Sequence, residues 1–289
     1  HPGVAESIRT AADPIYLTTV EQELGDFYYA VAVQALENEM QVGSRTIIEI
    51  CRRGAPYLVR AKRWDEATIL LERLLARDES SANSSLILPL LRQIAEVSSD
   101  TDSEWIGGSL LAKGLVAVGR RNEAEQILRG LIERFVAKND YRAASSIASI
   151  LFNIVKVTGR LDEALLLADK KVSYNRQAQV GPWTQLADET SRLQILTLMG
   201  KYEDVLYEIA EIRKRVPSLP LPSTPGHTGE EGLDPWQVLE AILDIGKMAA
   251  TYSSQWHIAI DLGAEMDRVQ AQRGADILQL TRSRFNNYS

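Results

Sequence analysis

A short turn motif recurs along the chain, and this recurrence constrains the fold more than any other feature of the sequence. The motif is a small residue, a basic residue, a variable residue, two acidic or polar residues and a small apolar residue. Its clear copies at 119, 159 and 200 are 40 and 41 residues apart. A unit of this length is typical of repeat architectures. Counting looser copies, the expected turns lie near residues 25, 61, 119, 159, 200 and 254.

Each unit is predicted to contain two helices. Leu111, Leu115 and Val118 recur at helical spacing before Gly119, and Ala124 and Leu128 begin a second periodic run after it. Glycine tolerates the positive φ that ends many helices. The acidic residues that follow the turn suit the positive end of the next helix.

Two longer spacings indicate insertions, at 78–85 and 217–235. The second insertion holds five prolines and is either disordered or folded across the binding groove as an internal peptide mimic. Pro182-Trp183 and Pro235-Trp236 precede their turns by similar distances. Because proline suits the first turn of a helix, each Pro-Trp pair is expected to open one.

The best-matching unit, Leu111-Ala112-x-x-Leu115 followed by Gly119 and Ala124, resembles the tetratricopeptide repeat (TPR) superfamily. The resemblance spans roughly residues 12–285. It implies an all-α fold: a right-handed α-solenoid of about six TPR-like helix-turn-helix repeats, forming a single repeat array over residues 1–289. The units are longer than the usual repeat of this family, so longer helices or loops are expected.

The pattern is also similar to repeat arrays of larger bacterial multidomain signalling proteins, some of which carry an NTPase or a caspase-like protease domain. This resemblance implies that the chain is a piece of a longer protein. Residues 234–289 show no polar capping helix, so self-association through uncapped terminal repeats is expected.

In the TPR family the first helix of each repeat lines the concave face, which binds partners. Reading back from each turn at helical spacing gives a stripe that is polar in three repeats and ends in a base. Such a face suits a peptide or a partner helix, with an acidic segment favoured; the alternative is a set of solvated helix faces. The candidate partner-binding residues are Ser109, Lys113, Arg120, Ser149, Asn153, Lys156, Arg160, Thr190, Gln194, Thr197 and Lys201.

The sequence therefore predicts a non-enzymatic scaffold that binds a protein segment. The alternative is a ligand- or peptide-sensing domain that controls an attached effector. No catalytic residue, metal site or cofactor is expected, because the chain lacks a phosphate-binding loop and hydrolase motifs and has one cysteine and three histidines.

The charge and the hydropathy pattern also bear on the expected partners and location. A net charge of −7 argues against nucleic acid as a partner. No apolar run reaches the length of a membrane span, and residues 1–10 do not resemble a signal peptide. A cytoplasmic location without membrane contact is therefore expected.

Overall fold

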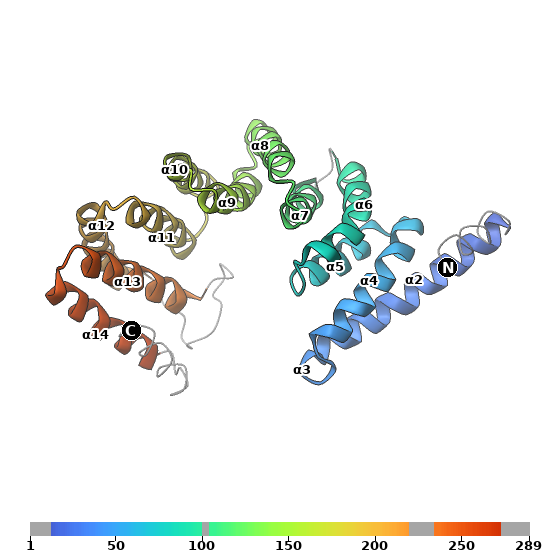
Figure 1. Cartoon of the computed structure of the whole chain (residues 1–289), viewed down its shortest axis with the longest axis horizontal. Helices are drawn as coiled ribbons and strands as arrows, with labels where there is room; N and C mark the ends of the chain where they lie inside the picture. Colours follow the sequence, from blue (N-terminus) through green and yellow to red (C-terminus); the bar gives the residue numbers. More distant parts are fainter. Residues whose placement is uncertain (1–12, 100–103, 220–233, 273–289) are drawn as a thin grey trace. The chain divides into compact units, whose positions relative to one another are not determined.

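A computed structural model describes residues 13–99, 104–219 and 234–272. In these residues all regular secondary structure is helical: thirteen α-helices and one 3-10 turn, with no strand (Figure 1). The predicted all-α class is confirmed. None of the described helices combines the length and the apolar character needed to cross a lipid bilayer.

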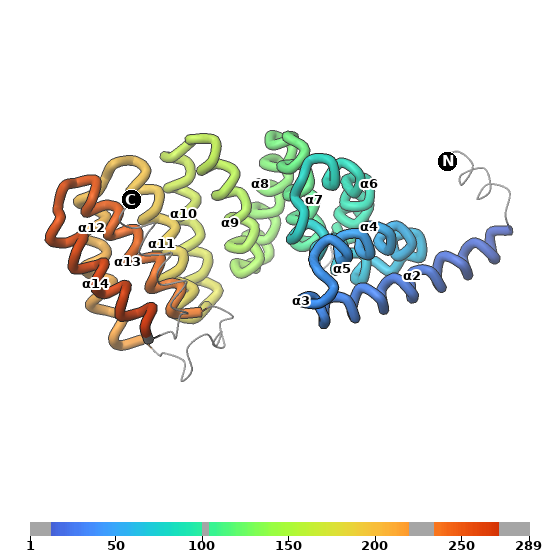
Figure 2. Tube along the Cα trace, turned by 60° about the horizontal axis from the view of Figure 1, so that its bottom comes forward, coloured from blue at the N-terminus to red at the C-terminus, as the bar shows by residue number. Residues whose placement is uncertain are grey.

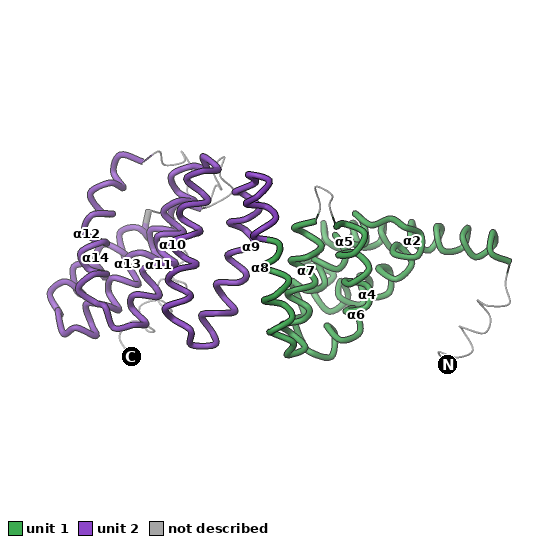
Figure 3. The backbone as a smooth tube through the Cα atoms, turned by 90° about the horizontal axis from the view of Figure 1, so that it is seen from above, with its two compact units in different colours: residues 1–131 green, residues 132–289 purple. Residues whose placement is uncertain are grey.

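The chain divides into two compact units, residues 1–131 and 132–289 (Figure 3). In unit 1, α2 packs against α4, α4 against α5, and α6 against α7. Its core is formed by buried leucines of several helices, such as Leu58, Leu70, Leu91 and Leu115. The helices of unit 1 are α2 (Pro14–Glu37), α3 (Glu39–Val42), α4 (Ser44–Arg60), α5 (Trp64–Leu75), α6 (Ser81–Val97), α7 (Glu104–Ala117) and the first part of α8 (Arg121–Ala137).

Unit 2 contains paired helices in two layers. Consecutive helices run side by side with alternating direction (Figure 2), and α9, α11 and α13 lie on one side of α10, α12 and α14 (Figure 1). We call α9, α11 and α13 the first layer. The bounds are α9 (Tyr141–Val157), α10 (Leu161–Gln177), α11 (Pro182–Leu198), α12 (Tyr202–Arg215), η1 (Val216–Ser218), α13 (Pro235–Tyr252) and α14 (Trp256–Gln272).

The turns share one backbone geometry. At Gly200, φ is +75°, the Gly200 N–H donates to the Thr197 carbonyl, and the next N–H donates to the Leu196 carbonyl. This pair of bonds is the Schellman motif, which satisfies the last free carbonyls of a helix. The same pattern of bonds and a positive φ recur at Lys62, Gly119, Asn139, Gly159, Gln179 and Ser254. Positions 119, 139, 159, 179 and 200 are 20 or 21 residues apart, so each repeat contains two turns of the same kind.

The turn expected near residue 25 is wrong. Gly25 is buried in the middle of α2, which continues without a break from Pro14 to Glu37. A Cβ at Gly25 would lie 3.2 Å from a methyl carbon of Leu58 in α4. This glycine therefore permits close packing of two helices instead of a change of chain direction.

The insertion expected at 78–85 lies at the start of an additional helix, α6 (Ser81–Val97). Residues 81–85 are the first turn of α6, capped by the Ser80 hydroxyl, which accepts from the Asn83 N–H at 3.3 Å. Asn83 and Ser84 are buried, and an additional helix fills the long spacing. Serine and asparagine suit helix starts as well as loops. Of the second expected insertion, residues 220–233 lie outside the described part of the chain.

The two Pro-Trp pairs open helices as predicted. Pro182 and Pro235 occupy the first turns of α11 and α13. The Asp234 carboxylate accepts from the Trp236 N–H at 3.0 Å, which caps α13. Trp183 and Trp236 are both buried in the core of unit 2. These residues therefore set where α11 and α13 begin.

Candidate interaction face

The structure brings part of the predicted stripe together on neighbouring first-layer helices. Asn153 of α9 and Gln194 of α11 are both exposed. The Lys156 ammonium donates to Gln194 Oε1 at 3.0 Å and lies 5.4 Å from the centroid of the Phe152 ring. This amine is thus held between a carboxamide and an aromatic face. The contact shows that α9 and α11 present their stripes side by side.

Within unit 2, the hydroxyl groups of the stripe are already hydrogen-bonded within their own helices. Ser149 donates to the Ser145 carbonyl at 3.0 Å, and Thr190 donates to the Leu186 carbonyl at 2.9 Å. Thr197 is buried and donates to the Leu193 carbonyl at 2.9 Å. Serine and threonine in helices often bond back in this way. Thr197 is therefore a packing residue, and its expected place on an open face is wrong.

Most of the basic side chains directly after the turns form ion pairs with a glutamate of the following helix. Arg160 pairs with Glu163 at 3.2 Å, and Arg120 pairs with Glu123 in the same i,i+3 relation. At Lys201 the residue three positions later is Asp204, whose side chain is one methylene shorter than that of glutamate. Lys201 is exposed and has no ion pair with any described residue. The predicted basic stripe is thus reduced, within unit 2, to Lys156 and Lys201.

The remaining predicted residues lie in the other unit. Ser109 of α7 is buried, and its hydroxyl has no hydrogen-bond partner in the described residues. Lys113 of the same helix is exposed, and Arg120 follows the turn. These three belong to unit 1, whereas the other eight candidates belong to unit 2. The predicted set therefore does not form one described site.

An exposed apolar row on the first layer was missed by the sequence analysis. Val157, Leu198 and Tyr252 are 69%, 54% and 62% exposed. Each stands two residues before the positive-φ residue of its turn, at Gly159, Gly200 and Ser254. The predicted stripe stepped from 153 to 156 and from 194 to 197, while these side chains lie one residue further on. The signal was present as an apolar residue at the same register in three units.

We call Val157, Leu198 and Tyr252 the turn row, and Asn153, Gln194 and Met248 the middle row. Members of the middle row lie six residues before the same turns, and Met248 is 39% exposed. Residues four apart share one face of a helix. Each first-layer helix of unit 2 therefore presents one middle-row and one turn-row side chain on one face.

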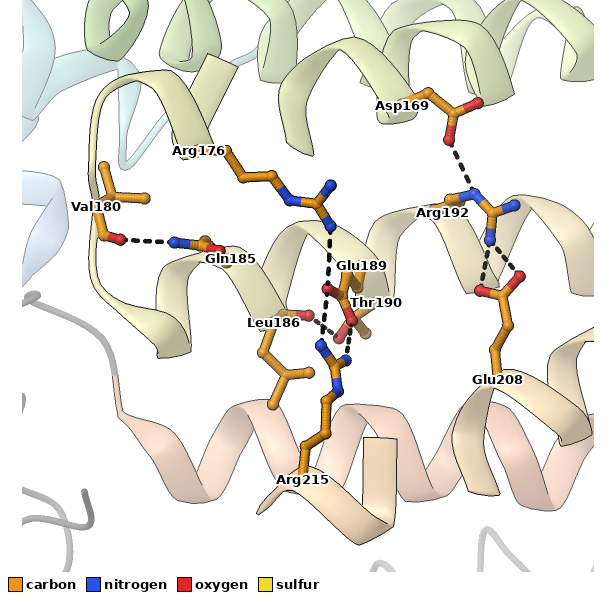
Figure 4. A network of polar contacts seen from close by, with 10 residues as sticks. All are labelled: Asp169, Arg176, Val180, Gln185, Leu186, Glu189, Thr190, Arg192, Glu208 and Arg215. Carbon is orange, nitrogen blue, oxygen red and sulfur yellow. Dashed lines mark hydrogen bonds and ion pairs between the residues drawn. The ribbon is translucent and has the colours of Figure 1, made fainter. Parts of the chain in front are cut away.

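The other side of α11 is engaged in holding its neighbours (Figure 4). Arg192 donates to Asp169 of α10 at 2.8 Å and pairs with Glu208 of α12. Glu189 bridges Arg176 of α10 and Arg215 of α12. Arg192 lies about 200° around the helix from Gln194. These charges therefore stabilise the helix packing, and the face with Gln194 and Leu198 is the one left open.

A buried polar cluster ties α11 to α10. The Lys171 ammonium lies 3.1 Å from Asp188 Oδ1, and the Asn175 side-chain amide donates to Asp188 Oδ2. All three side chains are buried. Lys171 also lies 5.4 Å from the centroid of the Phe152 ring, which Lys156 approaches as well. The Phe152 ring thus connects this buried cluster to Lys156, which contacts Gln194.

The chain's one cysteine does not reach the surface. Cys51 is fully buried, and burial raises the pKa of its thiol to about 11, so it is protonated at neutral pH. No group of three or more His, Cys, Asp or Glu residues with metal-binding geometry occurs in the described ranges. The feature that recurs from helix to helix is instead the exposed turn row on α9, α11 and α13.

The chain was also compared with known proteins. No protein-family model matches it, and no curated protein matches it.

Proposed function

We propose that this chain is a non-enzymatic protein-interaction module built as a TPR-like right-handed α-solenoid, and that a partner segment binds across the first layer of unit 2. The observation that carries the proposal is the turn row. Three large apolar side chains are more than half exposed at the same register of three first-layer helices. Single exposed apolar residues are common, but an aligned series on neighbouring helices is a feature of interaction surfaces.

The surroundings of the turn row support binding of a segment over binding of a small molecule. The middle-row side chains of α9 and α11, Asn153 and Gln194, are polar and flank it, and Lys156 and Lys201 lie nearby. An apolar centre with a polar border is typical of protein interfaces. A row that crosses three helices matches an elongated partner, because a compact ligand would contact one or two of them.

The test selects peptides from a random displayed library on the full chain and measures their affinity for two variants. Leu198→Ser removes an apolar side chain of the turn row. Leu166→Ser is the matched control, because Leu166 lies on α10 and is 55% exposed against 54% for Leu198. Fully burying a leucine contributes about 1.5–3 kcal/mol, so Leu198→Ser should weaken binding about tenfold or more. Leu166→Ser should leave it unchanged.

Circular dichroism of both variants would verify that the helices remain intact. If selected peptides bind the wild-type chain and the Leu198→Ser variant equally well, the first-layer face is not where the partner binds, and the proposal fails.

A further inference from the structure

The chemistry of the partner follows from how the two rows are arranged; this inference rests on the proposed function. Both rows run across the helices, with one side chain from each of α9, α11 and α13. A complementary segment must therefore repeat its own side chains at the separation of neighbouring helices. α11 packs directly against α13, and packed helix axes are about 8–10 Å apart. α9 meets α11 through the hydrogen bond from Lys156 to Gln194.

Few peptide conformations repeat at that distance. A β-strand places side chains on one face about 7 Å apart, which is too short, and the next on that face about 14 Å apart, which is too long. A polyproline II helix rises about 3.1 Å per residue with three residues per turn, so every third side chain recurs after about 9 Å. An α-helix recurs after seven residues, at about 10.5 Å. Spacing alone therefore permits two conformations of the partner, a polyproline II helix and an α-helix.

The middle row distinguishes them. An ammonium group can only donate, so the Gln194 atom that accepts from Lys156 is the oxygen, and the Gln194 amide is left as a donor. Asn153 has no side-chain hydrogen bond with any described residue. An α-helical partner uses its backbone carbonyls internally, whereas a polyproline II segment has no internal hydrogen bonds and presents them to a surface. The carboxamides that α9 and α11 present, Asn153 and Gln194, therefore match polyproline II.

The end of the turn row is aromatic. The ring centroids of Tyr252 and Tyr202 are 5.8 Å apart with an interplanar angle of 45°, and Tyr252 is 62% exposed. Proline-rich segments dock against aromatic side chains of this kind. The pair therefore suits the ring of a proline that reaches α13.

Positive charge lies beside the part of the turn row on α9 and α11. Lys201 follows Leu198 by three residues and is exposed without an ion pair in the described chain, and Lys156 stands on α9. A carboxylate next to the peptide residue that meets Leu198 would be attracted to both amines.

We propose that the partner is a polyproline II segment with an apolar side chain at every third position and an acidic residue near the position that contacts Leu198. The probe is a fluorescent peptide of three Pro-Asp-Leu triplets. The comparison peptides are a scrambled version, one of three Pro-Asn-Leu triplets, and an amphipathic α-helix with leucine at every seventh position. Fluorescence anisotropy with the full chain measures the four affinities.

We expect the Pro-Asp-Leu peptide to bind more tightly than the other three, and the preference over Pro-Asn-Leu to shrink as salt screens the lysines. Leu198→Ser should weaken its binding about tenfold and Leu166→Ser should not. Gln194→Ala should also weaken it, whereas Gln177→Ala on α10, which likewise removes a carboxamide from an exposed residue, should not.

Two results would separate the inference from the proposed function. If the helical peptide binds in a Leu198-dependent way and the Pro-Asp-Leu peptide does not, polyproline II recognition is overturned while the interaction face stands. If neither peptide binds and library-selected peptides ignore Leu198→Ser, both proposals fail.

Discussion

At the scale of single residues, the turns show which side chains tolerate a left-handed backbone. Gly119, Gly159 and Gly200 occupy this region with no neighbouring atom within 4 Å of where a Cβ would lie. Other turns place Lys62 or Ser254 there, with φ near +60°. A left-handed residue other than glycine is strained by roughly 1–2 kcal/mol. The turns thus share one backbone conformation, and the residue at the positive-φ position determines how strained each turn is.

This strain predicts opposite effects for two reciprocal substitutions. Gly200→Ser introduces a Cβ at φ +75° where space is open, so backbone strain alone should lower the free energy of unfolding by about 1 kcal/mol. Ser254→Gly removes the same strain. It should raise the free energy of unfolding by about 0.5–1 kcal/mol, after the greater conformational entropy of glycine in the unfolded chain is counted. Urea denaturation followed by circular dichroism measures both. A neutral or stabilising Gly200→Ser would contradict the argument.

Glycine turns were predictable because glycine adopts a positive φ without strain. The turns at Lys62 and Ser254 have no glycine and were found from the recurring motif, whereas those at Asn139 and Gln179 carry neither glycine nor the motif and were missed. Gly25 shows the converse error: the same residue type also serves close helix contact, and the sequence alone does not separate the two uses.

At the scale of helices, two of the ion pairs that join α10 to α11 lie in contrasting surroundings. Lys171–Asp188 is buried, with side-chain exposures of 6% and 10%. Asp169–Arg192 joins the same two helices, but the Asp169 side chain is 52% exposed. Removing one partner of a buried pair leaves the other charge without compensation, whereas an exposed pair is weakened by solvent and salt.

Asp188→Ala is therefore expected to lower the free energy of unfolding by about 3–5 kcal/mol, and the matched control Asp169→Ala by less than about 1 kcal/mol. The double variant Lys171→Met/Asp188→Leu should recover much of the loss, because it removes both charges and keeps the volume filled. Chemical denaturation of the three variants gives the comparison. Equal losses for Asp188→Ala and Asp169→Ala would show that burial does not govern this pair.

Helix positions were more predictable than the face they present. The repeat spacing and the Pro-Trp pairs located α9, α11 and α13, and Asn153 and Gln194 were found because polar residues at helical spacing are visible in a sequence. The turn row was missed because a helix has 3.6 residues per turn, and steps of three and of four both stay near one face. The sequence does not show which of two adjacent positions is covered by the neighbouring helix. Here position 197 is buried and position 198 is exposed.

At the scale of the whole chain, each compact unit has its own buried core. Leu70, Leu91 and Leu115 are fully buried within unit 1. Ile209, Ile242 and Leu262 belong to one buried cluster of unit 2. In repeat proteins the stability of a helix pair depends on the pair itself and its nearest neighbours. A local loss of stability should therefore stay within the unit where it arises.

Hydrogen exchange of the Asp188→Ala variant tests this expectation. Loss of the buried pair should raise amide exchange in peptides from α10, α11 and the helices packed on them, because local opening becomes easier there. Peptides from α4 and α5, which lie in unit 1, should exchange as in the wild-type chain. Mass spectrometry of exchanged peptides under native conditions measures both regions in one sample. An equal increase of exchange in α4 and α5 would mean that the two units open together as one cooperative array. A partner bound on the first layer of unit 2 would then stabilise the whole chain and not only the unit it contacts.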